Sequence, residues 1–117
     1  MHLPPPPKMV TAEEVTNGKP DPACYDLGRQ RIGLSGGASP ASILVVEDAP
    51  AGVRAGKAAG CTVLGLATTH SVESVIKAGA DVVVRDLKSL RVVKVEKGDD
   101  DGRTEIEVEF GELWVKT

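Results

Sequence analysis

The sequence predicts an α/β fold built on a parallel sheet. Between residues 42 and 84, short apolar runs of β-forming residues alternate with segments of helical spacing, in the order strand, helix, strand, helix, strand. These apolar runs are continuous, which is typical of parallel strands that are buried on both faces. From residue 91 onward apolar and charged residues alternate instead, which predicts a C-terminal β-hairpin with one solvated face.

The length and composition set limits on the function. The 117 residues allow one domain, and one residue each of Phe, Trp and Tyr leaves the core to aliphatic side chains. A net charge of −3 and so few aromatic rings argue against nucleic-acid binding. No apolar run approaches the roughly 20 residues that cross a bilayer, so no membrane partner is expected. Two cysteines and the lack of a secretory leader pattern predict a cytoplasmic protein with free thiols.

The composition divides the chain into three segments. Residues 1–7 form an irregular, proline-rich start, residues 8–90 form the α/β segment, and residues 91–117 form an acidic hairpin and tail. The stretch 96–112 has a net charge of −6, whereas the remainder of the chain has +3. Most of the negative charge therefore lies apart from the α/β segment.

Turn and capping signals place the individual elements. Residues 8–12 are expected to form a short strand. Asp21 is expected to cap a helix that starts at Pro22, runs to about residue 32 and ends at Gly33. Ser71 is expected to cap a later helix. The elements of the α/β segment are strands at 43–46, 62–66 and 82–84 and helices at 50–59 and 72–78.

Two adjacent carboxylates, Glu47 and Asp48, close the first apolar strand of the α/β segment. Ligands of open α/β sheets bind beyond the carboxyl ends of the strands. Two carboxylates at one place repel each other unless a cation neutralises them, and Mg²⁺ takes one or two protein carboxylates. An acid pair that is stabilised by the dipole of the following helix would give the same pattern. The residues alone leave both interpretations open.

Lys19 is the second candidate site residue. It lies between Gly18 and Pro20, on a stiff turn just before a helix, where an ammonium group is well placed to bind an anion. Many such lysines are only solvated, so Lys19 alone is a weak indication of function.

The two features together resemble the haloacid dehalogenase-like hydrolase superfamily. The segment 18–22 reads Gly-Lys-Pro-Asp-Pro, and a four-residue apolar strand further on ends in Glu-Asp-Ala-Pro-Ala-Gly at 47–52. The chain most resembles the fungal-type sugar-phosphate and glycerol-phosphate phosphatases, over roughly residues 8 to 115. This resemblance implies a Rossmann-like parallel sheet with flanking helices. It also implies hydrolysis of a small phosphorylated metabolite, a phosphate monoester, through an aspartyl-phosphate.

The resemblance assigns a role to each candidate residue. Asp48 resembles the direct Mg²⁺ ligand, and Glu47 resembles its partner in holding the metal. Lys19 resembles the lysine that pairs the nucleophile with the transferring phosphoryl group. These roles agree with the chemistry, because phosphoryl transfer requires positioning and charge neutralisation above all.

Two parts of the family pattern are absent from the sequence. The nucleophile motif Asp-x-Asp-Gly-Thr is missing. Its one lookalike, at 99–104, has an inserted arginine and follows Lys97-Gly98 where an apolar strand is required. The cap domain that selects substrates is also missing. The sequence therefore predicts a fragment that lacks the nucleophile strand and is inactive as an isolated chain.

Without the nucleophile strand, strand 42–46 is expected to have an unpaired apolar edge, through which the chain would self-associate. Two alternatives to a phosphatase fragment remain. One is a non-catalytic module that binds a partner through this edge, and the other is one half of a pair of chains that complement each other.

Overall fold

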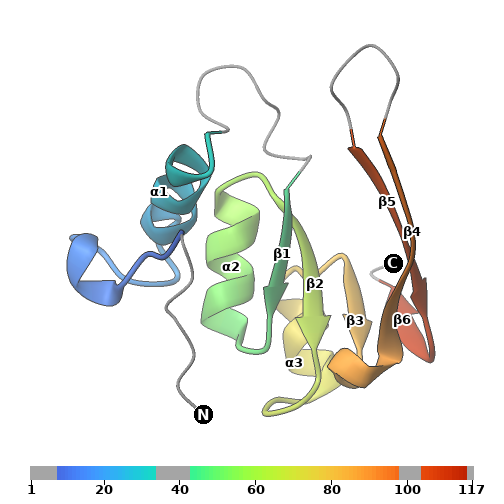
Figure 1. Ribbon diagram of the computed structural model, residues 1–117. Helices are drawn as coiled ribbons and strands as arrows, with labels where there is room; N and C mark the ends of the chain where they lie inside the picture. Colours follow the sequence, from blue (N-terminus) through green and yellow to red (C-terminus); the bar gives the residue numbers. More distant parts are fainter. Residues whose placement is uncertain (1–7, 34–42, 98–103, 116–117) are drawn as a thin grey trace, which may run out of the picture.

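The computed structural model describes residues 8–33, 43–97 and 104–115 (Figure 1). In these ranges two short 3₁₀ helices, three α-helices and six strands follow one another. The helices are η1 (Ala12–Glu14), α1 (Ala23–Arg31), α2 (Pro50–Ala58), α3 (Val72–Lys77) and η3 (Leu87–Ser89). The strands are β1 (Leu44–Glu47), β2 (Thr62–Leu66), β3 (Val82–Val84), β4 (Leu90–Lys97), β5 (Thr104–Phe110) and β6 (Leu113–Val115).

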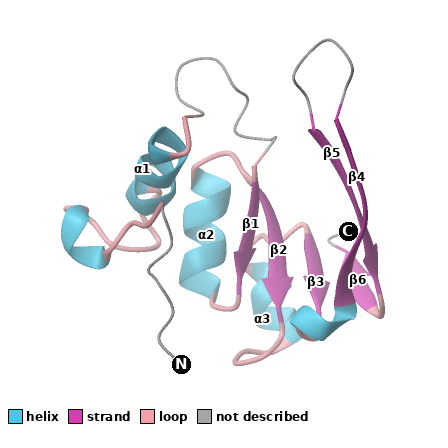
Figure 2. Cartoon of the chain, in the orientation of Figure 1, coloured by secondary structure: helices cyan, strands magenta, loops and turns pink. Residues whose placement is uncertain are grey.

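The main sheet has the strand order β1-β2-β3-β6. The strands β1, β2 and β3 are parallel and lie side by side, and β6 pairs antiparallel with β3 (Figure 2). The strands β4 and β5 form a separate antiparallel hairpin with one irregularity between Val92 and Lys94. The α/β class, the parallel strands and the C-terminal hairpin predicted from the sequence are confirmed.

One face of the main sheet is covered by α2 and α3. The buried residues Val45, Val63 and Val83 of the three parallel strands belong to one core cluster with Val53 of α2 and Val75 of α3. In α2 the small residues Gly52, Ala55 and Gly56 are buried, and small side chains allow a helix to pack closely on a sheet.

The base of the hairpin covers part of the opposite face. Leu64, Leu66 and Val84 are buried there against Leu90 and Phe110. The hairpin therefore protects β2 and β3, while its far end extends beyond the sheet (Figure 1).

The expectation that the first apolar strand is buried on both faces was wrong. Leu44 and Val46 of β1 are 49% and 42% exposed, whereas Val45 and Glu47 are buried. The reason is that the hairpin covers only β2 and β3 on that face. Within the described residues β1 pairs with β2 alone, so β1 lies at the edge of the sheet, as expected.

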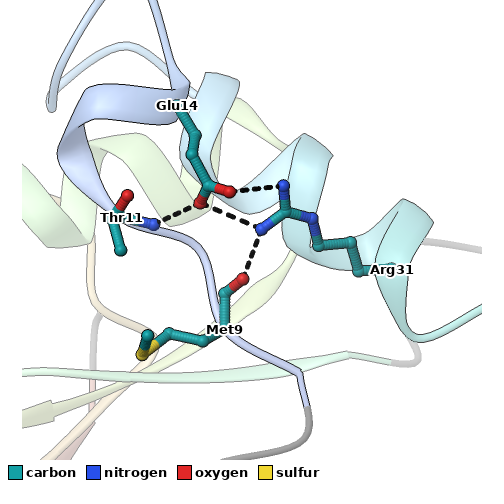
Figure 3. Close-up of polar contacts among 4 residues, drawn as sticks. All are labelled: Met9, Thr11, Glu14 and Arg31. Carbon is teal, nitrogen blue, oxygen red and sulfur yellow. Dashed lines mark hydrogen bonds and ion pairs between the residues drawn. The ribbon is translucent and has the colours of Figure 1, made fainter.

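The strand expected at residues 8–12 was also wrong, since this segment leads into η1 instead. Arg31 of α1 holds the segment, as Figure 3 shows. The Arg31 guanidinium donates to the Met9 carbonyl and, at 2.9 and 2.7 Å, to the two carboxylate oxygens of Glu14. The N–H of Thr11 donates to the same carboxylate at 2.6 Å. The Met9 carbonyl and the N–H of Thr11 are thus paired without a neighbouring strand.

The boundaries of α1 follow the predicted signals to within one residue. The Asp21 carboxylate accepts the N–H of Ala23 at 2.9 Å, and Pro22 already has helical dihedral angles. Gly33 ends the helix with a φ of 81°, a conformation that glycine adopts at little cost. Among the described residues, no helix is both long and apolar enough to cross a membrane.

Candidate active site

Lys19 and the acid pair meet at the carboxyl end of β1. Glu47 is the last residue of this strand, and Asp48 follows it just before α2. Lys19 approaches from the turn before α1, and its Nζ lies 2.5 Å from Oε1 of Glu47. The structure therefore brings together two residues that lie 28 positions apart and that the sequence selected independently.

Glu47 is buried at this position, with 8% of its surface exposed. Its Oε1 accepts hydrogen bonds from the Lys19 ammonium and from the Tyr25 hydroxyl. A buried carboxylate requires such partners, because an unpaired buried charge is costly. The carboxylate lies against Gly52 in the first turn of α2, where a side-chain Cβ would overlap it. The glycine therefore provides the space that Glu47 occupies.

Tyr25 is a site residue that the sequence reasoning missed. Its ring lies beneath the ammonium of Lys19, with 5.3 Å between Nζ and the ring centroid. Burial raises the pKa of the Tyr25 hydroxyl well above its usual range, and the hydrogen bond to Glu47 raises it further. The hydroxyl therefore stays protonated and remains a donor to Glu47. Tyr25 lies shortly after the Pro-Asp-Pro segment that follows Lys19, and this position could have indicated that its ring lies near the site.

Asp48 is held by the loop that follows β2. The Thr69 hydroxyl donates to Oδ2 of Asp48 at 2.9 Å. The Nδ1 of His70 lies 3.2 Å from the carbonyl oxygen of Asp48. Because a carbonyl oxygen can only accept, a hydrogen bond between these two atoms requires the proton to be on Nδ1. These contacts could not be predicted from local patterns, because they join Asp48 to residues 21 and 22 positions further along the chain.

A cleft of about 450 Å³ adjoins Asp48 on the face of the sheet opposite to α2 and α3. Clefts of this volume accommodate small ligands. The residues that line it are Val46, Asp48, Leu66, Thr68, Asp86, Leu87 and Lys88.

Comparison with known proteins identifies the family. Residues 7–60, which include Lys19, Glu47 and Asp48, match the family model described as haloacid dehalogenase-like hydrolase. The chain is 42% identical over 86 residues to glycerol-1-phosphate phosphohydrolase 2 of Saccharomyces cerevisiae, covering 71% of this chain and 34% of the yeast protein. The chain belongs to the haloacid dehalogenase-like hydrolases.

Two further matches support this assignment. The chain is 44% identical over 100 residues to hexitol phosphatase A of Escherichia coli, covering 83% of this chain and 42% of that protein. A β-phosphoglucomutase-like structure from Bacteroides vulgatus superimposes with a TM-score of 0.61 at 32% identity, over 68% of this chain and 32% of the other. This haloacid dehalogenase-like chain thus spans about a third to two fifths of the length of these relatives.

The carboxylates beside Lys19 were compared with the ligands that Mg²⁺ takes in proteins. No group of three or more His, Cys, Asp or Glu that could hold a metal ion occurs among them. The carboxylate of Asp48 fits Mg²⁺ as a single hard oxygen ligand. Glu47 is instead engaged by Lys19 and Tyr25. The assignment of Glu47 as the second metal ligand remains a prediction.

Proposed function

We propose that this chain forms part of a cytoplasmic, Mg²⁺-dependent phosphatase that hydrolyses small sugar or polyol phosphates. The observation that carries the proposal is the contact between Lys19 and Glu47, next to Asp48, at the carboxyl end of β1. Ligands of open α/β sheets bind at this end of the strands. The relatives named as glycerol-1-phosphate and hexitol phosphatases support the substrate class.

Each site residue has a distinct task in this proposal. The Lys19 ammonium would offset the charge of the transferring phosphoryl group. Asp48 would hold Mg²⁺, which supplies further charge neutralisation when it is bound. Thr69 fixes the carboxylate of Asp48, and Tyr25 fixes that of Glu47, so neither acid depends on substrate for its position.

We further propose that the chain is a fragment and is inactive alone. The aspartate that would form the aspartyl-phosphate is not found in any suitable motif of these 117 residues. In this proposal that nucleophile lies on a strand beside β1. A complete site would therefore need an aspartate from outside this sequence.

The test is a chimera with a complete relative. The matched third of yeast glycerol-1-phosphate phosphohydrolase 2 is replaced by this chain, and Mg²⁺-dependent phosphate release from glycerol 1-phosphate is measured. We expect the chimera to turn over and the isolated chain to show no activity. Lys19→Met and Asp48→Asn should each lower kcat by about 100-fold or more. The exposed lysine of α3 provides the control, since Lys77→Met should leave kcat unchanged.

Two results would contradict the proposal. The first is a chimera that keeps full activity after Asp48→Asn. The second is phosphate release by the isolated chain that disappears in the Asp48→Asn variant, which would show that no outside aspartate is needed.

A further inference from the structure

The cleft of about 450 Å³ beside Asp48 is built from the ends of three neighbouring strands. The strands β1, β2 and β3 are parallel, so their carboxyl ends lie along one edge of the sheet (Figure 2). Asp48 follows β1, Thr68 follows β2 and Asp86 follows β3, and all three line the cleft. Neighbouring strands lie about 4.8 Å apart, so the cleft extends for about 10 Å from its Asp48 end to its Asp86 end.

Hydrogen bonds within the chain hold the polar walls of this cleft. The Thr69 hydroxyl joins the loop after β2 to the carboxylate of Asp48. At the other end, Oδ1 of Asp86 accepts the N–H and the hydroxyl of Ser89, at 3.1 and 3.3 Å, and so fixes η3. The walls are therefore in place before a ligand enters, which reduces the entropic cost of binding.

The far end of the cleft offers both an acceptor and a donor. Both bonds from Ser89 end on Oδ1 of Asp86, and among the described residues nothing donates to its Oδ2. Lys88 is exposed and forms no ion pair with any residue that the structure describes. A carboxylate oxygen accepts hydrogen bonds and an ammonium donates them, so a ligand that does both can satisfy the two groups.

Apolar side chains form the rest of the lining. Leu87 and Val46 are 59% and 42% exposed, and they line the cleft together with Leu66. The C–H groups of a polyol can pack on such a surface, while its hydroxyl groups donate and accept. A ligand that ends in a carboxylate or a second phosphate fits less well, because Asp86 repels it and receives no proton from it.

The extent of the cleft favours a long leaving group. An extended chain advances about 1.2 Å per bond, so the distance from phosphorus to the terminal oxygen is about 10 Å in a six-carbon polyol phosphate and about 6 Å in glycerol phosphate. The longer molecule therefore reaches from a phosphoryl group beside Asp48 to Asp86 and Lys88, whereas the shorter one does not.

We propose that this cleft is the leaving-group subsite, and that Asp86 and Lys88 determine specificity for an uncharged, open-chain six-carbon polyol. The far hydroxyls of the polyol donate to Oδ2 of Asp86 and accept from the ammonium of Lys88. The inference deepens the proposed function and rests on it. The nucleophile strand of that proposal pairs with the outer edge of β1, away from β2, so it leaves the cleft open.

The experiment places the whole chain in a host that is named for six-carbon substrates. The chain replaces the matched part of hexitol phosphatase A of Escherichia coli, and phosphate release from sorbitol 6-phosphate, glycerol 1-phosphate and p-nitrophenyl phosphate is measured. The last substrate has no hydroxyl on its leaving group, so it reports on the reacting centre alone. We expect Lys88→Met to raise KM for sorbitol 6-phosphate about tenfold with kcat unchanged, because a charge-assisted hydrogen bond to the leaving group is lost. The other two substrates should be unaffected.

Asp86→Asn tests the acceptor at the far end of the cleft. Asparagine caps helices as well as aspartate does, so η3 keeps its bond from Ser89. The KM for sorbitol 6-phosphate should rise several-fold. In contrast, 6-phosphogluconate, which ends in a carboxylate, should be hydrolysed more efficiently than by the unaltered chimera, because the like charge is gone. Lys77→Met on α3 is the matched control and should leave every KM unchanged.

The inference is overturned if the chimera hydrolyses sorbitol 6-phosphate and neither substitution changes its KM. It is also overturned if Lys88→Met raises KM for all three substrates alike, since the lysine would then act at the phosphoryl group. If circular dichroism shows that one variant does not fold, the other decides the question. A chimera that releases phosphate from none of the substrates contradicts the proposed function and this inference with it, so the two kinds of failure are distinguishable.

Discussion

Replacing Gly52 by alanine tests whether Glu47 lies where the structure places it. A Cβ at residue 52 would come within 2.5 Å of Oε1 of Glu47 and still closer to Oε2. The flexible carboxylate must then move away, which breaks its contacts with Lys19 and Tyr25. Gly52→Ala therefore acts on the site from a helix that contributes no charged group to it.

The expected cost follows from the contacts that are lost. The Lys19 side chain is 43% exposed, so its ion pair is worth about 1 kcal/mol at most. The hydrogen bond from the half-buried Tyr25 to a carboxylate is worth about 2 kcal/mol. Alanine in place of a helical glycine stabilises the helix, which offsets about 0.5–1 kcal/mol of this loss. The free energy of unfolding should therefore fall by about 2 kcal/mol.

Urea unfolding followed by the fluorescence of Trp114 and by circular dichroism measures this change. Gly28→Ala on α1 is the matched control, because a Cβ there has room, and it should stabilise the chain by about 0.5–1 kcal/mol. In a Glu47→Ala background Gly52→Ala should also become stabilising, because the obstructing carboxylate is gone. If Gly52→Ala stabilises the unaltered chain as much as Gly28→Ala does, then Glu47 does not lie over Gly52.

Two further predictions concern stability. The Arg31 guanidinium lowers the pKa of Glu14 from 4.5 to about 2, so the stabilisation from this pair is complete above pH 4.5 and is lost as the pH falls toward 2. The difference in unfolding free energy between the unaltered chain and Glu14→Gln should shrink over this window in urea titrations, and a difference independent of pH would contradict the pairing. Gly65→Ala should lower the free energy of unfolding by about 1–3 kcal/mol, because its Cβ would overlap Val75 and lie 3.2 Å from the Cβ of Ala80. Thermal unfolding measures the second effect, and an unchanged Tm would show that α3 does not pack closely on β2.

The sequence predicted those parts of the fold that are set by local patterns. The apolar runs form the predicted strands, Gly33 ends α1, and the side chain of Ser71 caps α3 by accepting the N–H of Ser74; all of these are local signals. The missed features depend on distant parts of the chain. Residues 8–12 have strand-like composition, but the Met9 carbonyl accepts from Arg31 and the N–H of Thr11 donates to Glu14 instead. The short β6 was not predicted, because its pairing with β3 depends on the path of the hairpin.

The candidate site was predicted to a similar extent. Lys19, Glu47 and Asp48 could be selected because the local sequence shows that each is a charged residue beside a turn or at the end of a strand. Tyr25 and Thr69 could not, because a tyrosine on a helix and a threonine in a loop are ordinary residues until the fold brings them to the acid pair. The ion pair between Lys19 and Glu47 was likewise a property of the three-dimensional arrangement.

The last strand of the main sheet has a consequence for how the chain folds during its synthesis. The parallel strands β1, β2 and β3 are made first, yet β3 gains its second neighbour only when β6 has left the ribosome. The buried leucines of β2 likewise remain exposed until Phe110, the last residue of β5, has been made and packs against them. Pairings between residues far apart in sequence form slowly, and exposed apolar surface favours aggregation meanwhile. The last segment of the chain to be made, 91–115, therefore also buries the apolar residues of β2 and provides the second neighbour of β3.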